Sequence, residues 1–145
     1  MAQQPKFNVK IKPNYLDRYW SDDFIDYAHY ARYVRDAWLR YVRELGLDWP
    51  RDRVLMVLKE EHTYMSPVRV EEEARVCARQ ARMGRTSGTM EFQINEAGTG
   101  RPIALFRETV VWVDRKTGRP APIPGEWRQA IISFEGKENI EVVTG

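Results

Sequence analysis

The sequence predicts an α+β fold in which a curved antiparallel sheet wraps around one long central helix. Three observations predict it: one long stretch of helical periodicity, several later stretches typical of β-strands, and short connections between those strands. Consecutive strands with short connections form an antiparallel sheet, and the one large amphipathic helix must cover a face of it. The 145 residues fit a single domain (1–145), with a core at about 7–134 and a loosely held polar tail at 136–145.

The long helix is predicted between Tyr27 and Leu45. Turn and capping residues, Ser21-Asp22-Asp23, precede it, and Gly46 stands where a left-handed C-cap would end it. The apolar residues recur at intervals of three and four, which is the spacing of one helix face. They are Tyr27, Tyr30, Ala31, Val34, Ala37, Trp38, Tyr41, Val42 and Leu45. The stripe is broad and aromatic, so we expect a core helix.

Extended segments lie on both sides of this helix. Residues 7–19 predict a strand near a sheet edge with a kink at Pro13, because proline cannot donate a hydrogen bond to a neighbouring strand. The later strands are predicted at Val54–Tyr64, Glu72–Met83, Thr86–Asn95 and Ile103–Val113. The junctions between the last three of these strands are short enough for hairpins. A short closing helix is predicted at Glu126–Phe134.

Composition argues against several classes of protein. The net charge is +2, and 23 basic residues are scattered among 21 acidic ones, so no nucleic-acid partner is expected. We also expect no membrane span and no signal peptide, because the necessary apolar runs are absent. The lone cysteine, Cys77, excludes an internal disulfide and a cysteine-based zinc cluster. These observations favour a cytoplasmic protein.

Four local strings stand out along the chain. The first runs from Asp23 to Tyr33, and the others are Tyr64-Met65-Ser66-Pro67, Met83-Gly84-Arg85-Thr86-Ser87 and Val113-Asp114-Arg115-Lys116-Thr117-Gly118-Arg119-Pro120. In order and spacing they resemble the 4-hydroxybenzoyl-CoA thioesterase-like branch of the hotdog superfamily, over about residues 7–134. The first string keeps the family's Asp and Ala-x-Tyr in register. It has Asp26-Tyr27 in place of Gly-His and His29-Tyr30 in place of Asn-Asn.

The resemblance implies a hotdog fold and hydrolysis of an acyl-CoA thioester to a carboxylic acid and free CoA. Asp23 then corresponds to the family's catalytic Asp, which acts as nucleophile or general base. The backbone N–H of Tyr30, seven residues later at the start of the helix, corresponds to the oxyanion donor. From the residues alone, Asp23 reads more readily as a turn or N-cap carboxylate. Asp26 replaces a glycine where the family's backbone comes close to substrate.

The same resemblance suggests binding residues and an assembly. Arg85 and Ser87 match the turn that contacts the nucleotide end of CoA, with Arg82 beside them, and arginine pairs well with phosphate. Tyr27, His29 and Tyr33 are expected to contact the acyl substrate. The family's site usually spans a homodimer, often extended to a tetramer, so these arginines would serve the partner's Asp23. No cofactor is implied.

Other interpretations remain open. One is a thioesterase that acts on acyl-carrier protein, and another is a hotdog domain that binds an acyl ligand without turnover. The altered Asp26-to-Tyr30 stretch favours the second of these. A hotdog dehydratase is disfavoured, because no suitable His and acid pairing occurs. His62 lies on the same side of a predicted strand as Glu60, but two ligands make a poor metal site, so we expect His62 to be structural or to line a pocket.

Overall fold

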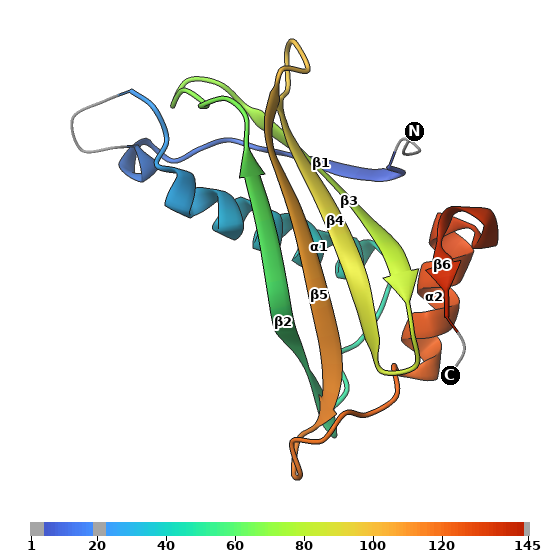
Figure 1. Ribbon diagram of the computed structural model, residues 1–145. Coiled ribbons are helices and arrows are strands. Elements are labelled where there is room, and N and C mark those ends of the chain that lie inside the picture. Colours follow the sequence, from blue (N-terminus) through green and yellow to red (C-terminus); the bar gives the residue numbers. More distant parts are fainter. Residues whose placement is uncertain (1–4, 19–22, 144–145) are drawn as a thin grey trace.

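A computed structural model describes residues 5–18 and 23–143. It shows a curved sheet with one long helix, α1 (Tyr30–Glu44), running across one of its faces (Figure 1). A second helix, α2 (Gly125–Glu135), lies beside the sheet at the end where α1 stops (Figure 1). This arrangement is the predicted α+β hotdog fold, and the prediction is confirmed.

The main sheet has strand order β1-β3-β4-β5-β2, and all its pairings are antiparallel. These strands are β1 (Phe7–Ile11), β2 (Arg53–Tyr64), β3 (Ala74–Met83), β4 (Ser87–Glu96) and β5 (Pro102–Asp114). The four long strands lie within two residues of their predicted bounds. Strand β2 forms one edge of the sheet and pairs only with β5.

The strand before the helix is shorter than predicted. It ends at Ile11, and a short 3₁₀ turn, η1 (Tyr15–Asp17), follows it. Asn14 caps this turn: its side chain accepts from the Leu16 N–H, and the Asp17 carboxylate accepts from the Asn14 N–H. This capping box gives the backbone a local alternative to sheet pairing.

Helix α1 packs its apolar stripe onto the inner, concave face of the sheet. Its buried residues are Tyr30, Tyr33, Val34, Ala37, Trp38, Tyr41 and Val42. The helix starts three residues later than predicted, because a 3₁₀ turn, η2 (Tyr27–His29), precedes it. Gly46 has φ 68° and donates its N–H to the carbonyl of Arg43, as a left-handed C-cap requires.

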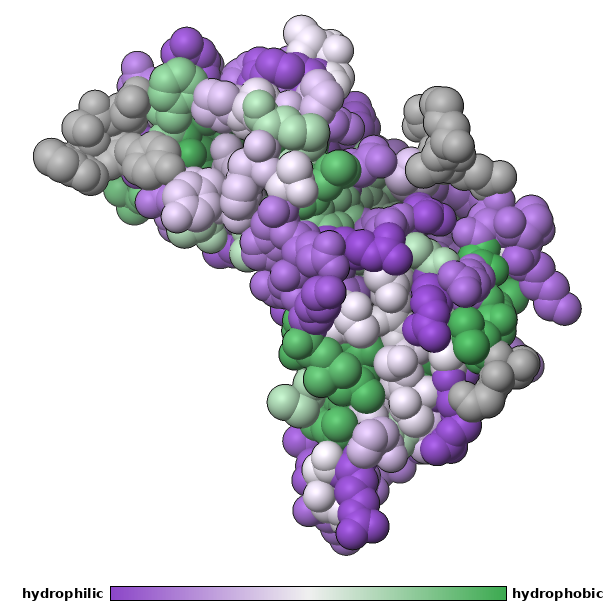
Figure 2. Space-filling model, viewed as in Figure 1, coloured by the Kyte–Doolittle hydropathy of each residue, from purple (hydrophilic) through white to green (hydrophobic). Residues whose placement is uncertain are grey.

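The outer face of the sheet is polar across its middle. The register aligns Arg79, Glu91, Arg107 and Glu61 across the four long strands, and Arg79 and Arg107 both pair with Glu91. Figure 2 shows these hydrophilic residues as a band, with a hydrophobic area over the lower part of β2 and β5. In the described part of the chain no helix is long and apolar enough to cross a membrane.

The C-terminal segment is more ordered than its polar sequence predicts. Residues Lys137–Asn139 form a 3₁₀ turn, and β6 (Glu141–Val142) pairs in parallel with the end of β3. The Val143 N–H donates to the carbonyl of Met83, and the Ile140 side chain is buried. These residues therefore have regular structure: Ile140 joins the core, and β6 pairs with the part of β3 that lies beyond β1.

Candidate active site

Asp23 lies in the loop just before α1, as predicted, and its side chain is exposed. The backbone at Asp23 and directly after it is held by the segment between β2 and β3. The Val70 N–H donates to the carbonyl of Asp23, and the Ile25 N–H donates to the carbonyl of Val68, both at 2.9 Å. Ser21 and Asp22, the other predicted turn residues, lie outside the described residues. Asp23 is thus on a loop that is anchored to the sheet on its C-terminal side.

Two open pockets flank this anchored loop. One, of about 260 Å³, is lined by Phe24, Ser66, Pro67, Arg69, Glu72 and Arg101. The other, of about 270 Å³, is lined by Ile25, Tyr27, Tyr30, Tyr64, Met65, Ser66 and Pro67, and we call it the tyrosine pocket. The two share Ser66 and Pro67, and the residues directly after Asp23 line both of them. The loop of Asp23 therefore lies where the two pockets meet.

Arg101, in the turn between β4 and β5, fixes the shared wall of these pockets. Its guanidinium forms two hydrogen bonds of 3.1 Å to the Glu72 carboxylate and one of 2.9 Å to the carbonyl of Pro67. It also donates to the hydroxyl of Ser66. The hydrogen bonds from Arg101 lower the pKa of Glu72, although burial opposes the shift. No motif in the sequence distinguished Arg101 from the other arginines.

The start of α1 differs from the expectation for an oxyanion donor. Asp26 caps the preceding turn: its side chain accepts from the Ala28 N–H at 3.0 Å, and its carbonyl accepts from the His29 N–H. The Tyr30 N–H donates to the carbonyl of Tyr27. The expected donor is therefore already engaged. Tyr30 can stabilise an oxyanion only by releasing this bond or by sharing it, as bifurcated bonds at helix ends do.

Two of the expected substrate-binding residues, His29 and Tyr33, instead surround the buried Asp17. The Tyr33 hydroxyl donates to the Asp17 carboxylate at 2.7 Å, and Nδ1 of His29 lies 3.5 Å from it. Arg32 pairs with the same carboxylate. Burial opposes ionisation of Asp17, but the hydrogen bonds from Tyr33, Asn14 and Arg32 lower its pKa overall. Tyr33 is only 2% exposed and lines neither pocket, so its polar side chain stabilises the start of α1.

A line of polar and aromatic side chains extends from the tyrosine pocket along the inner face of the sheet. The Tyr64 ring packs against those of Tyr27 and Tyr30, with centroids 5.3 and 5.9 Å apart. Its hydroxyl lies 3.1 Å from Nδ1 of His62, whose ring stacks on Phe106 at 3.9 Å. His62 thus lies beside a pocket-lining residue. The alternation of side chains along a strand is the only sequence signal that grouped His62 with Glu60.

Two carboxyl groups end this line. Nε2 of His62 lies 3.2 Å from Oε2 of Glu60, an ion-pair distance without the alignment of a good hydrogen bond. Glu60 is paired in register with Glu108 on β5, which is 7% exposed. Burial and the hydrogen-bonded carboxyl of Glu60 raise the pKa of Glu108 to about 7, and Arg35 on α1 opposes this. No group of three or more His, Cys, Asp or Glu side chains suited to a metal ion occurs among the described residues.

The expected CoA-binding residues lie at the other end of the sheet. Arg85 is in the turn between β3 and β4, and Ser87 begins β4. Asp23 is beside the opposite end of β4, because Ala74, which follows the loop that holds Asp23, pairs with Glu96. The ten residues of β4 separate the two groups by roughly 30 Å. One chain therefore does not bring Asp23 and Arg85 together.

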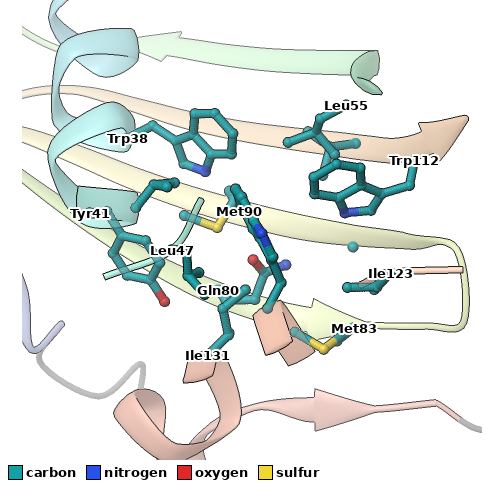
Figure 3. Close-up of a pocket in the computed structure, with 14 residues that line it drawn as sticks. Trp38, Tyr41, Leu47, Leu55, Gln80, Met83, Met90, Trp112, Ile123 and Ile131 are labelled. Atoms are coloured by element: carbon teal, nitrogen blue, oxygen red, sulfur yellow. The ribbon is translucent and has the colours of Figure 1, made fainter. Parts of the chain in front are cut away.

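A small cavity lies near that second end, between α1, α2 and the sheet. Trp38, Trp112, Met90 and Leu55 are among the side chains that point into it (Figure 3). Its volume is about 30 Å³, which leaves room for no more than a water molecule or two. It is a packing gap in the core and is too small for an acyl group.

Comparison with solved structures supports the fold. A 1,4-dihydroxy-2-naphthoyl-CoA thioesterase from Synechocystis superposes with a TM-score of 0.82 at 14% identity, covering 88% of this chain and 96% of that one. A Staphylococcus aureus protein solved in complex with CoA has a TM-score of 0.81 at 15% identity, covering 100% and 92%. A Pseudomonas aeruginosa protein has a TM-score of 0.80 at 25% identity, covering 90% and 92%. Among curated proteins, none matches this sequence significantly.

The sequence also matches a family model directly. Residues 20–131 match the model of the thioesterase-like superfamily, a range that contains Asp23, both pockets and the turn of Arg85. The match covers well over half of the 145 residues, and it confirms the predicted class of thioester hydrolases. The chain belongs to the thioesterase-like superfamily.

Proposed function

We propose that this protein is an acyl-CoA thioesterase, which hydrolyses an acyl-CoA to a carboxylic acid and free CoA. The observation that carries the proposal is the family match, because it spans the exposed Asp23 and the residues that line the two open pockets beside its loop. The solved relatives with similar folds include one named as a CoA thioesterase and one with CoA bound, which supports CoA as the thiol.

Asp23 is the proposed reactive group. Its carboxylate either adds to the thioester carbonyl carbon or removes a proton from the water that adds. In both cases the carbonyl oxygen becomes negative, and the C–S bond then breaks to release the CoA thiolate. When Asp23 itself adds, the product is an anhydride of Asp23 and the acyl group, which water then hydrolyses to the carboxylic acid and the free Asp23 carboxylate. The N-terminus of α1 is the proposed site of oxyanion stabilisation, with the Tyr30 N–H released from or shared with the carbonyl of Tyr27.

A second copy of the chain completes the proposed site. Within one chain, Asp23 is roughly 30 Å from the turn that carries Arg85, which is the span of the ten residues of β4. Edge strand β2 exposes Met56 and Leu58, at 52% and 66%, and it has an unpaired side that a second copy could cover. We infer a homodimer in which Arg82, Arg85 and Ser87 of one copy bind the CoA phosphates for Asp23 of the other. A dimer of such dimers would make the tetramer.

A domain that binds an acyl ligand without turnover is the second candidate. It is favoured by the capping carboxylate of Asp26 and by the engaged N–H of Tyr30, because both oppose an oxyanion at the start of α1. Thiol release therefore has to be measured together with binding.

The decisive experiment follows release of free thiol from a panel of acyl-CoAs and from acyl-carrier protein. We expect the unchanged chain to hydrolyse acyl-CoA and Asp23→Asn to lose at least about 100-fold in kcat. Asp36→Asn, an exposed helix carboxylate paired with Arg40, is the matched control and should keep full activity. Equal rates for Asp23→Asn and the unchanged chain would remove Asp23 from the mechanism. Binding of acyl-CoA without thiol release would favour the second candidate.

Mixing two inactive variants tests the shared site. Asp23→Asn and Arg85→Glu should each be inactive alone, and dimers formed from one copy of each contain one intact site. Random reassociation should therefore restore roughly a quarter of full activity. No recovery, although mixed dimers are present, would place both residues in the site of a single chain.

A further inference from the structure

We propose that the Tyr64 hydroxyl donates a hydrogen bond to the thioester carbonyl oxygen, and that His62 and Glu60 hold it in position. The proposal rests on the proposed thioesterase function and assigns a catalytic residue beyond Asp23. It starts from the observation that the N–H groups of Ala28, His29 and Tyr30 already have acceptors within the chain. A donor from outside the helix would supply what the start of α1 lacks.

Tyr64 lies where such a donor is needed. It lines the tyrosine pocket, and its ring contacts those of Tyr27 and Tyr30 at the start of α1. The side chain is 46% exposed, so a ligand can reach it. Burial, the nearby Tyr27 and the charge of Glu60 raise the pKa of the Tyr64 hydroxyl, so it keeps its proton at neutral pH. A protonated phenol can donate to an oxyanion.

His62 determines which way the hydroxyl proton points. Nδ1 of His62 lies 3.1 Å from the Tyr64 oxygen. When Nε2–H faces the Glu60 carboxylate and Nδ1 also carries a proton, His62 donates from Nδ1 to that oxygen, and the hydroxyl proton is left to donate into the pocket. The ring plane of His62 is held by stacking on Phe106 at 3.9 Å and by the Glu60 carboxylate on its far side. His62 and Glu60 are therefore positioning residues.

The charge on Glu108, which lies beside Glu60 at the end of this line, depends on pH. The groups that face it are Glu60 from β2 and Arg35 from α1, and Gln80 and Met90 occupy the same row on β3 and β4. While Glu108 is protonated, it shares a hydrogen bond with Glu60. When it ionises, two carboxylates on adjacent strands repel each other.

In the reaction, Tyr64 transfers no atom. As an oxygen of Asp23 or of water adds to the carbonyl carbon, the π electrons of the C=O bond move to its oxygen, and the Tyr64 O–H stabilises that charge. The electrons return as the C–S bond breaks and the pair on sulfur leaves with CoA. If water is the nucleophile, its proton goes to Asp23.

The test compares Tyr64→Phe with the unchanged chain in the thiol-release assay. Phenylalanine keeps the ring contacts, so we expect kcat to fall about 100-fold while KM and Tm stay nearly constant. Thr63→Val removes a hydroxyl from the neighbouring position on β2, which faces the other side of the sheet, and it should keep full activity. A kcat for Tyr64→Phe within a few-fold of the unchanged chain would overturn the assignment. An unchanged chain that hydrolyses no thioester would instead overturn the proposed function, and this assignment with it.

The positioning role has its own readouts. His62→Leu should lower kcat by a similar factor, and His62→Asn, whose amide nitrogen can replace Nδ1, should recover about ten-fold. The chain has two histidines, so nitrogen NMR can follow the His62 ring directly. Its Nδ1 signal should shift in Tyr64→Phe and stay in place in Thr63→Val. An unshifted signal in Tyr64→Phe would show that the two side chains are not hydrogen-bonded.

Discussion

The two ends of the sheet differ in what fills them. Around the start of α1, open pockets of about 260 and 270 Å³ are lined by three tyrosines and by the paired Glu72 and Arg101, and His62 lies beside Tyr64. Around the C-terminal end of α1, Trp38, Trp49, Trp112 and Trp127 pack with ring centroids 4.9–6.3 Å apart beside a cavity of about 30 Å³. The tryptophan end buries apolar area and stabilises the fold. The end that holds the tyrosine pocket, which we call the tyrosine end, keeps polar groups that lower the stability of the fold and that the proposed hydrolysis uses.

The largest effect is expected for Trp127→Ala, which tests whether the tryptophan end stabilises the fold. Trp127 is 3% exposed, contacts two other tryptophans, and donates its indole N–H to the carbonyl of Asp48. Its removal should lower the free energy of unfolding by about 3–5 kcal/mol, through the lost burial and the cavity left behind. Urea denaturation measures the loss, and thiol release at low temperature measures kcat, which should stay unchanged.

Trp49→Ala is the matched control for this change. Trp49 belongs to the same group of rings but is 46% exposed, so its removal should cost clearly less stability than that of Trp127. A Trp127→Ala protein that keeps its stability and loses hydrolysis would reverse the roles of the two ends.

A smaller effect is expected for Tyr41→Phe, where the two helices are joined. The Tyr41 hydroxyl donates to the Glu135 carboxylate of α2 at 2.6 Å, and the Gln80 N–H of β3 donates to the same oxygen at 2.8 Å. Burial and the Glu135 charge raise the pKa of Tyr41, so it remains a donor. Loss of this donor to a buried carboxylate should cost about 1–3 kcal/mol of unfolding free energy.

The same urea titration checks this prediction. Tyr15→Phe, which alters an exposed tyrosine of η1, should leave the unfolding midpoint unchanged. Equal midpoints for Tyr41→Phe and Tyr15→Phe would mean that the bond between α1 and α2 contributes nothing measurable.

The smallest expected effect is a change in how Tm depends on pH when Glu108 is replaced. The pKa of Glu108 is raised from 4.5 to about 7 in the folded protein, so between these values the folded chain holds a proton that the unfolded chain has lost. Its contribution to stability is therefore full below about pH 4.5 and is lost as pH rises through about 7. Glu108→Gln has no such proton, so its Tm should fall less than that of the unchanged chain between pH 5 and pH 8.

Glu61→Gln provides the comparison for that measurement. It removes an exposed carboxylate from the outer face of β2, the strand that pairs with the strand of Glu108, and its Tm should follow that of the unchanged chain across the range. If the Tm of Glu108→Gln changed with pH as much as that of the unchanged chain, Glu60 and Glu108 would not hold an extra proton in the folded protein.

Much of the fold could be predicted because local patterns encode it. Extended segments and the short turns between them marked the later strands, the three-and-four spacing marked α1, and Gly46 marked its end. A family motif likewise predicted that Asp23 precedes the helix. Tyr33 belongs to the same motif, but it lies in the core, where its hydroxyl donates a hydrogen bond to the buried carboxylate of Asp17. Asp17 lies sixteen residues earlier in the chain, so the motif could not predict this contact.

The sequence by itself therefore determined which segments are helix and strand, the fold class, the family and the loop of Asp23. Only the tertiary structure decided which side chains meet. Tyr64 reaches the start of α1 because the end of β2 lies across from it, and Glu108 joins Glu60 because β5 pairs with β2 in one register. Such contacts depend on strand pairing between residues far apart in the chain, and a one-residue slip would move each of them to the other face.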